Sequence, residues 1–102
     1  MKQVTLHEEA LMEMGAAKDY YEEKKSGLGD EFLVEVENAL ASVASNPQAF
    51  GFYRSTKFRK RLVKRFPYLV IYRERTQDVW VLAIAHTKRK PGYWSHRARA
   101  LS

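Results

Sequence analysis

The sequence contains no cysteine, which excludes both a disulfide framework and a zinc site built on thiolates. Long apolar runs are also missing, since none comes near the roughly 20 residues that a membrane-spanning helix needs. No basic segment followed by an apolar one opens the chain, so the sequence has no recognisable secretory leader. We therefore expect no membrane segment and, by default, a cytoplasmic location.

Common catalytic patterns are absent as well. The sequence has no glycine-rich phosphate loop, no Ser-His-Asp set and no close pair of carboxylates. His7 and His96 lack further ligands at metal-site spacing, so we expect neither a metal nor another cofactor. These absences exclude the commoner enzyme classes and leave open a phosphodiester cleavage carried out by cations.

We expect residues 1–102 to form one domain. Acidic residues are scarce only in its second half. Apolar residues make up 45% of the chain, enough for a modest core. Residues 1–53 carry 4 Lys/Arg and 10 Asp/Glu, a net charge of −6, whereas residues 54–102 carry 14 and 2, a net charge of +12. Such asymmetry indicates a surface for nucleic acid or an acidic protein. The alternative is a solvated face with attraction between the halves.

The acidic half has the pattern of two helices. Apolar residues recur every three or four positions over residues 8–25 and again over residues 28–45. Gly27 supplies a left-handed stop between them, and Pro47 ends the second helix. The short connection predicts an antiparallel helical hairpin over about residues 8–45. Residues 2–6 suit a short edge strand.

The basic half has the pattern of a strand meander over about residues 57–86. Residues 68–74 and 79–86 are β-branched and aromatic runs of strand length. A two-residue loop at Thr76 and Gln77 predicts the pairs Tyr72–Val81, Val70–Ala83 and Tyr68–Ala85. The opposite face then gathers Leu69, Ile71, Trp80, Leu82 and Ile84.

Both faces of this strand pair are apolar, so both must be covered. The helical hairpin can cover one face. The other must be covered by the C-terminal tail, residues 87–102, with Tyr93 and Trp94, or by a partner, or by both. The predicted fold class is α+β, a helical hairpin on a small, mainly antiparallel sheet with a C-terminal tail.

The first group of candidate functional residues is a row of cations. Period two places Lys57, Arg59, Arg61 and Arg65 on one strand face. Such a row can hold phosphates or stabilise a pentacoordinate phosphate transition state. The alternative is a polar strand face that pairs with the acidic helices.

The second group lies at the end of the last strand. His86 precedes the basic turn Lys88-Arg89-Lys90, and like charge favours the neutral ring that a general base needs. The alternative is a structural histidine that caps the sheet. Tyr72, Tyr93 and Trp94 can stack on bases near these cations, although Trp94 suits equally well as a cover for the second sheet face.

Several segments, in their order and spacing, resemble the RelE/ParE superfamily, the toxins of bacterial type II toxin–antitoxin modules. They are Tyr20-Tyr21, Gly27-Leu28-Gly29 with Phe32, Phe66-Pro67-Tyr68 with Ile71-Tyr72-Arg73, and the tail from His86 through Tyr93-Trp94 to Arg97. The resemblance spans about residues 8–97. It implies a helical hairpin on a small antiparallel sheet and a cognate antitoxin whose tail covers the sheet and its basic groove, forming a toxin–antitoxin hetero-oligomer.

The resemblance implies one of two activities. RelE-like members cut ribosome-bound messenger RNA without a metal; carried over, their catalytic residues would be Arg61, Arg65, His86 and Arg89, with Tyr93 weaker. ParE-like members bind and inhibit DNA gyrase. The long tail and the Gly-Leu-Gly segment favour the ParE-like branch. A third possibility is a stand-alone basic domain that binds nucleic acid.

The residues expected to contact an antitoxin or a nucleic acid come from the strands and the tail. They are Lys57, Arg59, Arg61, Tyr72, Trp80, Lys88, Arg89, Tyr93, Trp94 and Arg97.

Overall fold

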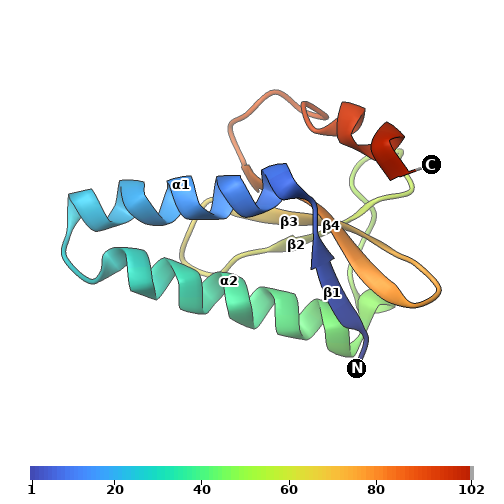
Figure 1. Cartoon of the computed structure of the whole chain (residues 1–102), viewed down its shortest axis with the longest axis horizontal. Helices are drawn as coiled ribbons and strands as arrows, with labels where there is room; N and C mark the ends of the chain where they lie inside the picture. The colour runs from blue at the N-terminus through green and yellow to red at the C-terminus, as the bar shows by residue number, and fades with distance from the viewer. Residues whose placement is uncertain (102) are drawn as a thin grey trace.

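The chain folds into two helices and a four-stranded sheet, shown by a computed structural model that describes residues 1–101 (Figure 1). The strands are β1 (Gln3–Leu6), β2 (Arg59–Leu62), β3 (Tyr68–Glu74) and β4 (Asp78–His86). The helices are α1 (Glu8–Lys24) and α2 (Leu28–Ser45), with the 3-10 segments η1 (Pro47–Ala49) and η2 (Ser95–Leu101). The strand order is β1-β4-β3-β2; β1 runs parallel to β4, and the other neighbours are antiparallel. The predicted α+β class is confirmed.

The two helices form the predicted antiparallel hairpin, lying side by side in Figure 1. Glu22 holds the turn between them, because its carboxylate accepts the backbone N–H groups of Gly27 and Gly29, each at 2.9 Å. These two hydrogen bonds lower the pKa of Glu22. Gly27 has a φ of 89°, the left-handed conformation predicted for the residue that separates the helices. α1 ends one residue before its predicted end, and α2 has its predicted bounds.

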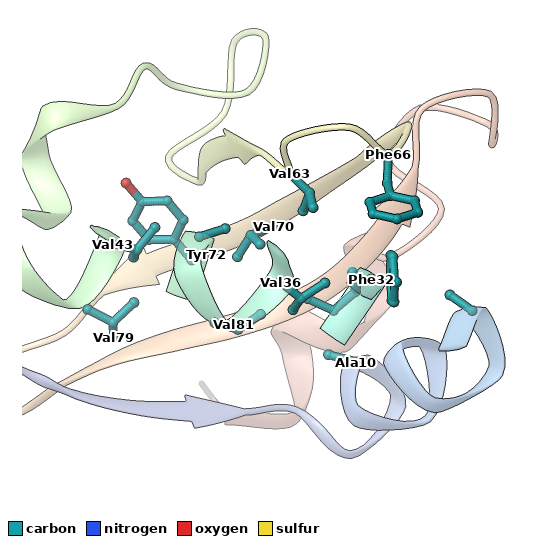
Figure 2. Close-up of a cluster of buried hydrophobic side chains, with 13 residues drawn as sticks. Ala10, Phe32, Val36, Val43, Val63, Phe66, Val70, Tyr72, Val79 and Val81 are labelled. Atoms are coloured by element: carbon teal, nitrogen blue, oxygen red, sulfur yellow. The ribbon is translucent and has the colours of Figure 1, made fainter. Parts of the chain in front are cut away.

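The helices cover one face of the sheet, and the side chains between them form the first core cluster (Figure 2). Phe32, Val36 and Val43 of α2 are 0% exposed and recur at helical spacing. α1 contributes Ala10 and Ala17, whose small side chains let this helix lie close to the sheet. The strands contribute, among others, Val70, Tyr72, Val79, Val81 and Ile84. The stripe predicted for the second helix is therefore core.

The pairing of β3 with β4 departs from the predicted register. The observed pairs include Tyr72–Val81, Val70–Ile84 and Tyr68–His86, of which only the first agrees with the prediction. The register shifts at a β-bulge next to Tyr72, where β4 holds one extra residue. Ile84 consequently points toward the helices, and the prediction that it faces the other way was wrong. Ala83 and Ala85 take places on that other face.

The opposite face of the sheet carries the second core cluster, which the C-terminal tail covers in part. Trp94 is 2% exposed, and its ring packs edge-on against Phe58 and Tyr53, with ring centroids 5.3 and 5.4 Å apart. The strand residues of this cluster are Ile71, Trp80, Leu82, Ala83 and Ala85, with Leu69 packed against them. The sequence left open whether the tail, a partner or both cover this face, and the structure places the tail, through Trp94, over part of it.

Candidate functional site

A hollow of about 540 Å³, here called the basic groove, opens on the tail side of the sheet. Leu62, Leu69 and Ala85 give it an apolar floor. The residues that complete its lining come from the loop before β2, from β2 itself, from the end of β4 and from the segment after it. They are Tyr53, Arg54, Lys60, His86, Thr87, Arg89, Lys90, Pro91, Tyr93 and Trp94. The groove thus combines an apolar floor with a basic rim.

The cations on the rim of the basic groove mostly have no acidic partner. Within the described residues, no carboxylate lies within 4.0 Å of Arg54, Lys60 or Lys90. Arg54 instead lies 5.7 Å from the centre of the Tyr53 ring, and its φ of 48° is in the left-handed region that few residues other than glycine adopt. Unpaired cations beside an open hollow favour the binding of an anionic partner.

The predicted row of cations is divided between the edge strand and a turn. Arg59 donates to the carbonyl of Phe50 at 2.7 Å, and Arg61 donates to the Ser42 hydroxyl of α2 at 3.2 Å. Both side chains therefore point toward the helix side. Because side chains alternate along a strand, Lys60 points the other way, into the basic groove. The predicted contact set omits Lys60.

Arg65 does not extend this row, because it lies beyond β2 in a turn with a φ of 71°. Its guanidinium is 2.6 Å from a Glu31 carboxylate oxygen and 3.8 Å from one of Glu35, both on α2. Arg61 and Arg65 thus contact the acidic helix, as the alternative interpretation of the row has it. Lys57, which precedes β2, is exposed.

His86 stands at the end of β4, where it lines the basic groove. Its Nδ1 accepts the backbone N–H of Lys88 at 3.0 Å, and its carbonyl accepts the N–H of Arg89 at 3.1 Å. Its ring packs edge-on against Tyr68. In the neutral ring the proton is therefore on Nε2, so neither nitrogen offers an unused lone pair. These contacts agree with the histidine that caps the sheet.

A carboxylate that the sequence did not single out joins α1 to the tail. Glu13 accepts hydrogen bonds from the Tyr93 hydroxyl at 2.5 Å and from both terminal nitrogens of Arg97 at 2.9 Å. Burial and this carboxylate raise the pKa of Tyr93. The Arg89 guanidinium lies over the Tyr93 ring, 3.7 Å from its centre. Glu13 thus contacts a tyrosine that packs against Arg89, a cation of the groove rim.

The sequence model of a protein family, described as the ParE toxin of the type II toxin–antitoxin system parDE, matches residues 4–91 of the chain. The chain belongs to this family. A solved structure described as the chromosomal ParDE TA system from P. aeruginosa is similar, with a TM-score of 0.65 and 17% sequence identity. The match covers 86% of this chain and 98% of that chain, and at this identity it establishes the shared fold. No curated protein sequence matches the chain.

Within this ParE fold, four of the residues predicted to contact a partner are buried. Tyr72, Trp80, Trp94 and Arg97 are each at most 5% exposed. Tyr72 donates its hydroxyl to the carbonyl of Pro47 at 2.6 Å, and burial raises its pKa to about 12. These four side chains pack within the fold, and of the four only Trp94 lines the basic groove. Lys57, Lys88 and Arg89 are exposed.

The described part of this ParE chain offers no site for a metal. Among residues 1–101, no three His, Cys, Asp or Glu side chains gather as a metal ion requires. Over the same residues, no helix has both the length and the apolar character to cross a membrane.

Proposed function

We propose that this ParE family toxin acts by binding and inhibiting DNA gyrase, and that a cognate antitoxin neutralises it by covering the basic groove. The proposal chooses between the two activities that the wider superfamily suggests, gyrase inhibition and cleavage of ribosome-bound messenger RNA. We favour gyrase inhibition because the side chains that RNA cleavage would use are engaged in contacts within the fold.

Cleavage through a 2′-hydroxyl needs a base with an unused lone pair and cations that converge on one phosphate. His86 has no such lone pair in its neutral form, because Nδ1 accepts a backbone N–H. The Tyr93 hydroxyl donates to Glu13, which disfavours a role as acid or base. Arg61 and Arg65 contact α2 and do not line the basic groove with Arg89. This arrangement supports a role in binding.

The basic groove has the chemistry of a protein-binding surface for an acidic segment with apolar side chains. The floor formed by Leu62 and Leu69 can accept apolar groups, and Lys60 and Lys90 can pair with carboxylates. A disordered antitoxin tail is suited to such a surface, because it can follow an extended groove as it folds. An antitoxin in this groove would block the contacts that the toxin needs for its target.

A supercoiling assay with purified gyrase and relaxed plasmid tests the proposal. We expect the wild-type chain to inhibit supercoiling and the Lys60→Glu/Lys90→Glu variant to need about tenfold more protein, because both changes reverse charge on the groove rim. Arg73→Glu is the control for each single reversal, Lys60→Glu or Lys90→Glu, since Arg73 is an exposed cation of β3 outside the groove.

Three results would decide against the proposal. Full supercoiling at a large excess of wild-type chain would exclude gyrase as the target. Cuts in ribosome-bound message that disappear in Arg65→Ala would establish the nuclease activity instead. Tight, strongly salt-dependent binding to nucleic acid alone would favour the stand-alone binding domain. A growth assay tests the antitoxin: the chain is expressed in bacteria with and without the reading frame next to its gene. Growth restored by that frame would support a cognate antitoxin.

A further inference from the structure

The edge of β4 loses its strand partner halfway along. β1 pairs with β4 only as far as Leu6 and Val81, and the N–H of His7 donates to the Val81 carbonyl at 2.8 Å. Beyond this point α1 begins, so no strand continues along this edge. The bulge in β4 lies at the same place. The N–H and C=O groups of β4 beyond Val81 therefore need hydrogen-bond partners other than β1, because buried unpaired N–H and C=O groups are costly.

Two side chains supply these partners. Glu13 of α1 accepts the N–H of Ile84 at 3.1 Å, and Arg97 of the tail donates to the carbonyl of Leu82 at 2.9 Å. The two side chains also bind each other through both carboxylate oxygens. Arg97 is 5% exposed, so its charge is almost removed from water and is balanced mainly by Glu13, with Glu9 farther away at 3.6 Å. Together they continue the hydrogen bonding where β1 stops.

The same carboxylate sets the position of the wall of the basic groove. Glu13 accepts the Tyr93 hydroxyl and lies 3.9 Å from the Arg89 guanidinium, which stacks on the Tyr93 ring. Tyr93 and Arg89 line the basic groove on one side and a hollow of about 260 Å³ beside α1 on the other. We infer that Glu13 is a positioning residue of this toxin, which fastens the tail and thereby fixes Arg89 and Tyr93 at the rim of the basic groove.

The consequence for gyrase rests on the function proposed above, whereas the fastening of the tail does not. If Glu13 holds the rim, its loss leaves buried Arg97 with only the half-exposed carboxylate of Glu9, 3.6 Å from its Nε, and lets the segment from Lys88 to Arg97 move. Cleavage by trypsin after Lys88 and Arg89 then becomes faster, because proteases act on locally opened chain. Inhibition of gyrase weakens at the same time, because the rim cations lose their fixed positions.

The test compares Glu13→Gln with Asp19→Asn, which removes the same charge from an exposed position of the same helix. Limited trypsin digestion gives the cleavage rate between Lys88 and Lys90, and thermal unfolding gives the global stability. We expect Glu13→Gln to be cut there about tenfold faster than Asp19→Asn. Val36→Ala, which weakens the first core cluster away from the tail, serves as a control of comparable thermal stability.

Equal cleavage of Glu13→Gln and Asp19→Asn would overturn the inference, as would equal cleavage of Glu13→Gln and Val36→Ala at matched stability. Tyr93→Phe is a second variant in case Glu13→Gln does not fold, since it removes one hydrogen bond and keeps the ring. It should speed tail cleavage less than Glu13→Gln, and unchanged cleavage would count against the inference. A wild-type chain that leaves gyrase active would overturn the proposed target, while the digestion would still decide the role of Glu13.

Discussion

The two faces of the sheet are both apolar, but they are covered in different ways. The helix face is covered by two regular helices, and α2 alone places Phe32, Val36 and Val43 at 0% exposure. The tail face is covered by a loop and by a short 3-10 segment, with Trp94 as its main apolar anchor. On the helix face a broad apolar core joins the layers, and polar contacts such as Arg61 with Ser42 lie at its margin. On the tail face the apolar cover is smaller, and the polar contacts of Glu13 fasten it.

The difference follows from the kind of segment that does the covering. A helix of four or five turns presents a continuous apolar stripe, whereas a 3-10 segment of seven residues, Ser95–Leu101, does not. The tail therefore adds hydrogen bonds and an ion pair to hold its place. Its incomplete cover leaves the basic groove open, so the candidate site lies on the face that packing does not close.

The largest effect should come from opening the helix face. Phe32→Ala removes a side chain at 0% exposure whose ring contacts Tyr21, Phe66 and Tyr68, and we expect a loss of about 3–5 kcal/mol in the free energy of unfolding. Urea denaturation followed by far-ultraviolet circular dichroism measures it. Val34→Ala, at a 53% exposed position of the same helix, should cost less than about 0.5 kcal/mol. Similar losses for the two variants would contradict the assigned helix face.

Opening the tail face should cost less. Trp94→Ala should lower the free energy of unfolding by about 3 kcal/mol, the low end of the range for large aromatic residues, because Trp94 borders the open groove on one side. Circular dichroism at low urea should stay unchanged, since neither helix touches the indole, while trypsin should cut the tail faster. Loss of the helical signal in native buffer would show that the two faces do not separate in this way.

The fold followed from the sequence wherever the pattern was local. Helical spacing and the flanking Gly27 and Pro47 gave the bounds of both helices to within a residue. The apolar runs of β3 and β4 likewise gave their extent. The register failed at Tyr72, because a bulge adds a residue without changing composition or hydrophobicity. Nothing in a period-two pattern marks which residue of a continuously apolar strand is the extra one.

The close approach of the helices at their turn should give an intermediate effect. A Cβ at Gly29 would lie 2.6 Å from the backbone carbonyl oxygen of Lys18, so Gly29→Ala should cost about 1–3 kcal/mol through displacement of α1. Gly15→Ala is the control with the opposite sign. A Cβ there meets nothing within 4 Å, and the better helix former should stabilise the protein by about 0.5–1 kcal/mol. Thermal unfolding of both variants tests this pair, and equal signs would contradict the packing at Gly29.

The site was harder to predict than the fold. Charge counting located the basic half, but it could not tell Lys60, which faces the basic groove, from Arg61, which contacts α2. That distinction depends on which face of an edge strand the helices cover. Glu13 gave no signal either, because a glutamate in an acidic helix looks like a solvated one. Its role comes from residues more than seventy positions away that the topology brings to it.

The smallest effect on stability should come from an ion pair in the β3–β4 hairpin, whose strands contribute side chains to both faces of the sheet. Arg75 donates to both carboxylate oxygens of Asp78, at 2.7 and 2.5 Å, and these hydrogen bonds hold the pKa of Asp78 below its ordinary value of 3.8. A carboxyl whose pKa is lowered by folding stabilises the protein above its unfolded pKa. This contribution is lost as the pH falls through the folded pKa. Asp78→Asn should therefore cost less than about 1 kcal/mol at neutral pH and nothing at a pH below both values.

Urea denaturation of the wild type and Asp78→Asn from neutral pH down to strong acid measures the convergence of their stabilities. Arg75→Gln should give the same curve, because it removes the other half of the pair. Since the hairpin joins the two faces, the helical signal and tryptophan fluorescence should shift together in both variants. A shift in fluorescence alone would place this ion pair with the tail face, and a constant difference at every pH would mean that Asp78 acts through packing and not through its charge.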